Sequence, residues 1–460
     1  MSSVISPPTT QRQAGHYGLK KFVLRRFGES GSGLDLRLIV HTFNIVESMS
    51  NGAIRGSAVV YDSQDIIKNL PLRGEEYLEI QYEDYFGRTH TDHMFVYSIS
   101  DVKYANEKSQ AILRYVINFV SAGRFFSETF KVRKAYRQNA LNSGIISGYV
   151  NEVYEEYFRN PLSGYVYPIT PKQIEIESTT GQTHYVIPSL SPEQTMHFFA
   201  RRAYNEYRNT QTFRFFEARD KYYFATNEYM STVGVDIVGN SYGQVDPSLA
   251  TAVGIEEASV PIFRMNYLPD ISPDRQNSIM YELINIHYGT KVDTIEDINF
   301  GGYRRRAWEI DLLNGAVNSI DYNHYADFQS NDLQLPHTQA FIDNRMTRFR
   351  ETYIPKDYAS LGAQDGLNLR PNQNYPEIYN RKGSYFYHHD RNKITAKIYG
   401  RNSIFAGSVI SLELFEHSAS GDLSKDNERS GYYLVESVNN IFFESVYTQE
   451  LVLTRNGIGK

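Results

Sequence analysis

The sequence predicts a mainly β protein with α+β inserts, in which two antiparallel β-barrel domains are joined to two peripheral domains. From Asp35 to Ile99 apolar and polar residues alternate, which is typical of strands. The same alternation returns in residues 385–460. The third observation is the composition of the 460-residue chain, whose 37 Tyr and 26 Phe favour half-buried strands and broad contact surfaces.

The first barrel is expected over residues 34–121. Asp62 is suited to cap a short helix that Pro71 would end, and a strand is expected at Tyr77–Tyr82. The stretch that starts at Ser109 fits a helical spacing at some positions, but its β-branched residues and its cleaner alternation favour a strand. A sheet of this size satisfies its edges best by closing on itself, and we therefore predict a barrel.

A helical insert domain is predicted over residues 122–205. The apolar residues of Ile146–Tyr157 follow the spacing of an amphipathic helix, and Asn160-Pro161 would end it. A second helix is expected to begin at Ser191–Gln194, where Ser is a good cap, Pro suits the first helical position and Gln completes a capping box.

The second barrel is predicted to be discontinuous, with parts at residues 206–265 and 385–460. The first part holds a hairpin over Phe213–Phe224, in which aromatic residues flank a short turn. The second part holds β-like segments that Gly400, Gly407 and a polar run separate. We expect the hairpin and these segments to close together.

A peripheral insert domain is predicted over residues 266–384. The chain from about residue 240 onward is the least regular part of the sequence, and a structureless loop of that length is unusual inside a compact domain. Short strands are expected only around Gln276–Tyr288 and Ala307–Leu313. We therefore place this region outside the barrels.

Composition and charge exclude several classes of function. The chain contains no cysteine, which removes disulfides, thiol catalysis and thiolate metal sites. The net charge of −6 implies no general affinity for nucleic acid or anionic membranes. Residues 1–33 are expected to form a polar N-terminal arm without a signal-peptide core. Since no apolar run approaches the roughly 18 residues of a membrane span, we expect a soluble chain with no membrane insertion.

Two histidine clusters resemble metal sites, but their sequence settings argue against metal binding. His90–His93 contains two histidines and an aspartate, and we expect it at a solvated hairpin tip, without the buried support that a metal site needs. His388–Asp390 is expected in a strand, where adjacent histidines point to opposite faces and do not easily share a metal.

Other charged groups also lack a chemical context. Glu155 and Glu156 share a helix, with no partner acid at a spacing that indicates a glycosidase. Arg304–Arg306 is better explained as an interface or a solvated edge than as a nucleic-acid site. The sequence contains no phosphate-binding loop, nucleophile elbow or zinc-protease motif. We therefore predict no catalytic, cofactor-binding or metal-binding residues, and no enzymatic activity.

The order of several short motifs resembles the central baseplate hub family of contractile-tailed bacteriophages. In the first β unit these motifs are Glu47-Ser48, Asp62-Ser63 and the turn Pro71–Glu76. The hairpin FRFFEARDKYYF resembles the family's F-x-F-x-E-x-R-D-x-Y-x-F element, and the helix over 191–205 resembles the helix that precedes it. The segments GSVISLELF, SGYYLVESV and YTQELVLTRNG resemble the closing strands. The resemblance covers about two-thirds of the chain and is weakest over 240–384.

The resemblance implies a structural role. Hub subunits of this family carry two tube-like barrels each and form a homotrimeric ring with pseudo-sixfold symmetry. Such a ring joins the hexameric tail tube, or a tube-initiator ring, to the trimeric central spike, and contacts other baseplate (wedge) proteins. Its lumen passes DNA without binding it, and a mildly acidic chain suits this because a basic lumen would retain the phosphate backbone. The expected location is the tail baseplate of the virion, after assembly in the host cytoplasm.

Two alternatives remain at this stage. A hub or spike-base component of another contractile injection system would carry the same barrels. A cell-wall hydrolase would need a cleft with paired carboxylates or a supported metal, and it is much less favoured by the residues.

Overall fold

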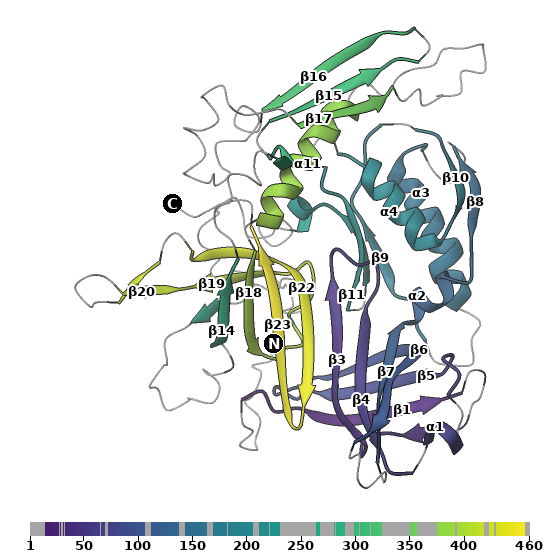
Figure 1. The fold of residues 1–460 in the computed structure, drawn as a ribbon, viewed down its shortest axis with the longest axis vertical. Helices are drawn as coiled ribbons and strands as arrows, with labels where there is room; N and C mark the ends of the chain where they lie inside the picture. Colours follow the sequence, from purple (N-terminus) through teal and green to yellow (C-terminus); the bar gives the residue numbers. More distant parts are fainter. Residues whose placement is uncertain are drawn as a thin grey trace, which may run out of the picture.

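The computed structural model describes residues 14–455, apart from 106–111, 138–142, 163–168, 206–210, 231–263, 267–279, 290–298, 324–349, 357–374, 418–422 and shorter gaps at 27, 29–30, 32, 65, 70–71, 182, 220, 281, 303, 313, 392 and 427–428. The fold is mainly β, as the sequence predicts (Figure 1). Its largest element is a 13-stranded sheet that contains strands from both ends of the chain. No helix in the described ranges has the length and apolarity to cross a membrane.

The first half of this sheet comes from the N-terminal part of the chain. In the sheet order its strands are β3 (Val40–Ser48), β4 (Arg55–Asp62), β7 (Leu113–Ser121), β6 (Thr89–Tyr104), β5 (Tyr77–Glu83), β1 (Gly18–Arg25) and β2 (Leu34–Asp35). The strands predicted at 77–82 and from 109 onward are confirmed. The carboxylate of Asp62 accepts backbone hydrogen bonds from Gln64 and Ile66, the latter at the start of α1 (Ile66–Asn69), at 2.8 and 2.5 Å. Pro71, the predicted end of α1, lies outside the described residues.

The prediction of a polar arm over 1–33 is wrong for its last part. β1 pairs along β5 and buries Phe22 and Leu24 in the core of the N-terminal half. Its two lysines, Lys20 and Lys21, form ion pairs with acids of β5 at 2.9 and 2.8 Å. These charges give the segment a polar composition, although the three apolar residues Phe22–Leu24 follow the lysines. Residues 1–13 lie outside the described residues.

The second half of the sheet comes mainly from the C-terminal part of the chain. Its strands are β22 (Gly431–Phe443), β23 (Val446–Thr454), β18 (Ile394–Tyr399), β14 (Leu283–Tyr288), β19 (Val409–Glu413) and β13 (Arg264–Asn266). Four of these, β18, β19, β22 and β23, correspond to the four C-terminal segments that the sequence predicts as strands. A small ribbon of β20 (Phe415–His417) and β21 (Leu423–Lys425) extends beyond them. β14 was expected in the peripheral insert, but it pairs with β18.

Among the described strands one ladder joins the two halves, and an isolated antiparallel bridge between His16 and Val446 lies beside it. β22 pairs antiparallel with β3 over seven residue pairs, from Ser437 opposite Ser48 to Phe443 opposite Thr42. Across this seam three aromatic rings lie face to face on adjacent strands: Phe43, Phe442 and Tyr447, with 4.3 Å between neighbouring centroids. We expected each unit to close into its own barrel. Among the described strands the sheet is instead an open path, because the edges of the two units pair with each other.

The helical insert covers one end of the N-terminal strands (Figure 1). Its elements are α2 (Ala122–Ser127), β8 (Val132–Tyr136), α3 (Ile146–Tyr154), a π-helical turn (Glu155–Arg159), a 3-10 turn (Asn160–Leu162), β9 (Gln173–Ile176), β10 (Tyr185–Leu190) and α4 (Pro192–Arg202). Both predicted helices are confirmed. The capping box at the start of α4 is also present, because Ser191 Oγ accepts from the Gln194 amide at 3.3 Å and Gln194 Oε1 accepts from the Ser191 amide at 3.0 Å.

The hairpin of β11 (Arg214–Ala218) and β12 (Lys221–Ala225) does not complete a second barrel. β12 pairs in parallel with β9 of the helical insert, and the hairpin has no backbone ladder to the C-terminal strands that the structure describes. Both of its faces are buried. Phe215 and Tyr222 pack with the helices, whereas Phe216 and Tyr223 pack against Leu434 and other residues of the C-terminal half. The hairpin therefore lies between the helical insert and the C-terminal half of the sheet.

The outer unit lies at the far end of the molecule from the N-terminal strands (Figure 1). It consists of the sheet β16 (Val317–Asn323), β15 (Arg304–Ile310) and β17 (Arg350–Pro355), in that order, and the helix α11 (Tyr375–Arg391). The strand expected at 307–313 corresponds to β15. Most of the remaining chain between 231 and 374 lies outside the described residues, and the domain boundaries stay a prediction.

Candidate functional site at the hairpin junction

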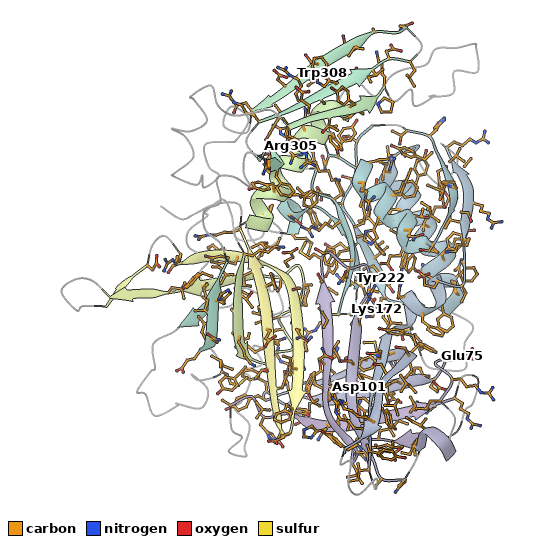
Figure 2. All side chains as sticks on the ribbon, in the orientation of Figure 1. Glu75, Asp101, Lys172, Tyr222, Arg305 and Trp308 are labelled. Atoms are coloured by element: carbon orange, nitrogen blue, oxygen red, sulfur yellow. The ribbon has the colours of Figure 1, made fainter. Side chains whose placement is uncertain are left out.

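The tip of the β11–β12 hairpin carries a buried carboxylate that binds three separate segments. Glu217 is 1% exposed. It accepts hydrogen bonds from the hydroxyl of Ser121, at the end of β7, and from the amide of Ile54, 3.2 Å away. Its other oxygen lies 2.7 Å from Lys172 Nζ, which Figure 2 places beside Tyr222 at the centre of the molecule. One side chain thus ties the hairpin to the N-terminal strands.

A second charge stands at the turn of the same hairpin. Arg219 has a φ of 51°, a left-handed turn conformation. Its positive charge opposes the rise that burial produces in the pKa of Glu47. The pKa of Asp92 is lowered in spite of burial, mainly by His90, and Arg219 contributes to this shift. Burial still raises the pKa of Glu47, whose carboxylate accepts the amide of Ala406 at 3.3 Å. The tip therefore places a cation among buried acids of the N-terminal half of the sheet.

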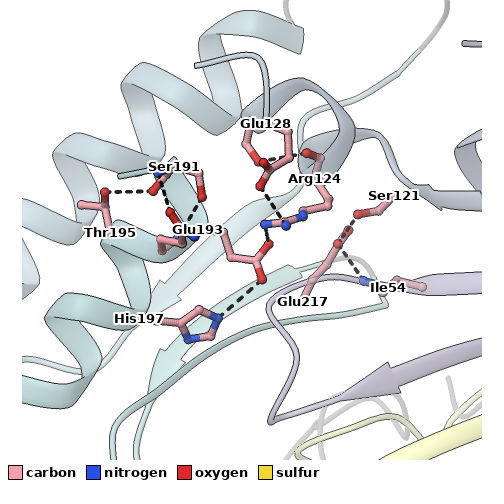
Figure 3. Close-up of polar contacts among 11 residues, drawn as sticks. Ile54, Ser121, Arg124, Glu128, Ser191, Glu193, Thr195, His197 and Glu217 are labelled. Atoms are coloured by element: carbon pink, nitrogen blue, oxygen red, sulfur yellow. Dashed lines mark hydrogen bonds and ion pairs between the residues drawn. The ribbon is translucent and has the colours of Figure 1, made fainter. Parts of the chain in front are cut away.

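A third set of contacts joins the helices of the insert to one another (Figure 3). Arg124 of α2 pairs with Glu193 in the first turn of α4 and with Glu128 at 2.8 Å. Gly52 packs so closely on Glu193 that a β-carbon there would collide with the carboxylate. Because Glu193 also lies at the helix N-terminus, the helix dipole stabilises its charge.

The C-terminal half is held by Glu436 of β22. Its carboxylate accepts from the Ser50 hydroxyl at 3.0 Å and lies 3.5 Å from Arg214 and 2.9 Å from Lys393. Burial alone would raise the pKa of Glu436, but the hydrogen bond from Lys393 and the neighbouring cations hold it below its usual value. Glu436 thus links β22, the hairpin and the loop after β3.

These contacts bring together residues from three of the resembling motifs. Glu47-Ser48, the E-x-R element of the hairpin and the V-E-S of β22 meet at one buried junction. Sequence reasoning quoted all three but did not see that they meet. The available signal was Glu217 itself, an acid among the aromatic residues of the hairpin strand, which indicates a buried acid with a specific partner. The opposite charges of the junction neutralise one another. Its contacts hold the N-terminal strands, the hairpin and β22 together.

The described part of the Pro71–Glu76 motif, residues 72–76, forms a separate local turn. The carboxylate of Glu76 accepts three successive backbone amides, from Arg73, Gly74 and Glu75, at 2.5, 3.0 and 3.2 Å. Gly74 has a φ of 86°, which favours glycine. Its role is to shape the entry into β5.

Replacing Glu76 by alanine should lower the free energy of unfolding by about 1–3 kcal/mol, because three backbone donors lose a charged acceptor. Urea denaturation measures this change. The neighbouring substitution Glu75→Ala is the control, because Glu75 is exposed. Equal losses for the two variants would contradict the assignment.

The predicted loop at His90–His93 is wrong in its secondary structure. The segment lies within β6, and Asp92 is buried. His90 Nε2 lies 3.2 Å from Asp92 Oδ1, and His93 Nδ1 contacts the Tyr77 hydroxyl. Burial lowers the pKa of His93. In the part of the chain that the structure describes, no three metal-ligating side chains are grouped closely enough to hold an ion.

His388–Asp390 lies in α11 rather than in the predicted strand. His389 is buried there. The segment is separated in sequence and in element from the His90–His93 cluster, and the structure does not bring the two together.

The remaining charged candidates have ordinary structural partners. Glu155 pairs with Arg159 at 2.8 Å and Glu156 with Lys134 at 3.0 Å, both near the surface. In the arginine run, Arg306 makes a two-point contact with Asp321. Arg305 is buried and donates to the carbonyls of Gly301 and Phe300, and burial lowers its pKa to about 10. The expected solvated edge is therefore wrong for Arg305.

Lys382 of α11 provides a pH-dependent contact with the helical insert. Its Nζ donates to the carbonyl of Ala200 near the end of α4, at 2.5 Å. Burial lowers the pKa of Lys382 to about 7, while the charge of Glu228 opposes the shift. Since an unfolded chain keeps this lysine charged up to its ordinary pKa, the unfolded state binds more protons between about pH 7 and pH 10.4, and the Lys382 contribution to stability rises with pH in that window.

Replacing Lys382 by methionine should remove that rise. The measurement is the urea midpoint at pH 7 and at pH 9 for the wild type and the variant. Lys397→Met, on the surface of β18, is the matched control and should leave the pH dependence unchanged. A rise of the same size in the Lys382 variant would show that another group is responsible.

No protein-family model and no curated protein matches the sequence. Among solved structures, the chain is similar to a tail protein from Neisseria meningitidis, with 9% identity, a TM-score of 0.48 and coverage of 96% of this chain and 98% of that one. It is similar to a 43 kDa prophage tail protein from Shewanella oneidensis, with 7% identity, a TM-score of 0.49 and coverage of 95% and 98%. A chain of the Francisella PdpA–VgrG complex aligns at 10% identity and a TM-score of 0.46, over 97% of this chain and 59% of that one. Since all three TM-scores are below 0.5, the proposal that follows is drawn from the chain's own motifs and strand pairing.

Proposed function

We propose that this chain is a structural subunit of a contractile-tail baseplate hub, with no enzymatic role. The observation that carries the proposal is the seam between β3 and β22, which places two β units of one chain side by side in one sheet. A subunit with two such units offers two similar positions to a partner of higher symmetry. In this proposal three subunits form a ring with six positions, which matches a hexameric tail tube on one side and a trimeric spike on the other.

The solvent face of the joined sheet supports a passage for DNA. Four short polar side chains lie directly opposite one another on neighbouring strands: Asn44, Ser57, Asn118 and Ser98. Their polar atoms bond to each other, with Ser57 Oγ to Asn44 Oδ1 at 2.6 Å and Asn118 Nδ2 to Ser98 Oγ at 3.1 Å. The row continues across the seam, where Asn44 Nδ2 lies 3.4 Å from Asn439 Oδ1. An uncharged row with internally paired donors offers little to retain phosphates.

The partners follow from this role. We infer contacts with tail tube or tube-initiator subunits, with the central spike and with wedge proteins, in a virion baseplate assembled in the host cytoplasm. A hub of another contractile injection system is the second candidate, and the seam suits it equally well.

The test is the mass and symmetry of the purified full chain. We expect a ring of three 53.0 kDa subunits by mass photometry, and a sixfold-like inner wall in electron micrographs. Immunogold labelling of purified tails at the baseplate end separates a phage hub from a related machine. A monomer that degrades peptidoglycan would overturn the structural role.

A further inference from the structure

The hairpin that joins β15 and β16 ends in an exposed, uncharged tip. Leu312 is 79% exposed and Val317 is 56% exposed. From Asp311 to Ile320 the sequence DLLNGAVNSI contains one charged residue, Asp311. Large exposed apolar side chains that cluster on one protruding element mark an interaction site more strongly than scattered ones.

The single charge at this tip is turned inward and compensated. Asp311 is buried, and its carboxylate accepts the amide and the side-chain Nδ2 of Asn314 at 3.1 and 3.0 Å. Lys356, at the end of β17, lies 3.4 Å from the same carboxylate. The tip therefore presents no uncompensated charge to a partner. No charged group would have to lose its water when the tip enters an apolar environment.

Polarity changes in steps along the exposed face of the same sheet. Behind the tip, Val317, Ile310 and Pro355 lie opposite one another in an apolar row. Two residues further along the strands, Trp308 and Tyr353 lie side by side, with ring centroids 6.5 Å apart, and Tyr353 is 65% exposed.

The third row is ionic. Arg306 lies between Asp321 on β16 and Glu351 on β17, and its guanidinium stands 5.6 Å from the Trp308 ring. Figure 2 shows Trp308 on the sheet at the outer end of the molecule. The order is thus apolar tip, aromatic belt and charged base.

We propose that this tip, defined as Leu312 and Asn314–Val317 with Trp308 and Tyr353 behind it, enters the interface of a lipid bilayer. The order of its rows matches the polarity gradient that an interfacial element meets, with apolar side chains in the acyl boundary, Trp and Tyr at the headgroups and charges in water. The compensated charges favour a zwitterionic surface over an anionic one. The contact is peripheral and does not span the membrane. The inference does not depend on whether the chain is a hub.

The chain offers a direct probe, because Trp308 is its only tryptophan. The full-length protein is mixed with phosphatidylcholine vesicles whose acyl chains carry bromine, which quenches tryptophan at short range. We expect a blue shift and quenching of Trp308 fluorescence, with little change when the zwitterionic lipid is partly replaced by an anionic one. Leu312→Asp should weaken vesicle binding about tenfold, because it puts a charge where the apolar tip enters.

Leu38→Asp is the matched control, because Leu38 is 98% exposed just before β3 and lies outside the outer unit. It should bind vesicles like the wild type. The proposal is overturned if the brominated vesicles leave Trp308 unquenched, as expected for a tip that docks only on protein. Equal weakening by both substitutions, or binding that requires anionic lipid, would also overturn it.

Discussion

Replacing Phe442 by alanine should lower the free energy of unfolding by about 3–5 kcal/mol, the usual cost of removing a buried aromatic side chain. Phe442 is fully buried and stacks between Phe43 of β3 and Tyr447 of β23, 4.3 Å from each. The ring of Tyr82 also meets it edge-on at 4.6 Å. Loss of Phe442 leaves a cavity at the ladder between β3 and β22, which joins the two sheet halves. Denaturant unfolding with a probe in each half measures the change.

Phe443→Ala is the control for this result. Phe443 is the next residue of the same strand, points to the opposite face and is 44% exposed. Its removal should cost less than about 1 kcal/mol, as for most surface substitutions. If the seam is the only strong link, the two halves should also unfold separately in the Phe442 variant. Similar losses at both positions would mean that the aromatic stack does not stabilise the seam.

Replacing Glu217 by glutamine should cost about 2–3 kcal/mol, because it keeps the shape of the side chain but leaves Lys172 without its counter-charge. A fully buried pair typically costs more, about 3–5 kcal/mol. Lys172 remains 26% exposed, and water therefore recovers part of the loss. The Glu217 carboxylate also holds the pKa of Lys172 above its usual value in spite of burial. Thermal and urea unfolding measure the change.

A double-mutant cycle isolates the pair. Combining Glu217→Gln with Lys172→Met removes the stranded charge and should recover part of the lost stability. Glu155→Gln is the surface control, since its pair with Arg159 is solvated and worth at most about 1 kcal/mol. A double variant that is no more stable than the single one would show that the hydrogen bonds from Ser121 and Ile54, and not the ion pair, carry the effect.

Local features of the fold were predictable from the sequence. The four C-terminal strands follow a period of two, and the helix after Ser191 follows its capping box, because both signals lie within a few residues. The choice of partner for a strand edge is not local. Nothing in β3 indicates that its neighbour is β22, and the predicted barrel closure failed for that reason. Likewise the aromatic residues of the hairpin indicate that both of its faces are buried. They do not indicate which strand pairs with its edge.

The junction was predictable only in part. Glu217 and Arg219 stood out as motif residues, whereas the partners of Glu217 come from β7, the loop before β4 and the segment before β9. The polar run at His90–His93 was misread as a turn because its charges compensate one another inside a strand. In α11 the tyrosines and Gly383 obscured a helical pattern. Gly383 packs against Arg305, and a β-carbon there would displace the guanidinium.

The seam has a consequence for the order in which the chain folds. Thr42 and Phe442, which share a hydrogen bond across it, are 400 residues apart in sequence. At typical synthesis rates of about 5–20 residues per second, β3 is synthesised about 20–80 s before its partner β22. During that time its backbone donors and acceptors stay open to other strands, including those of neighbouring nascent chains. Slower translation of this interval should therefore lower the soluble yield.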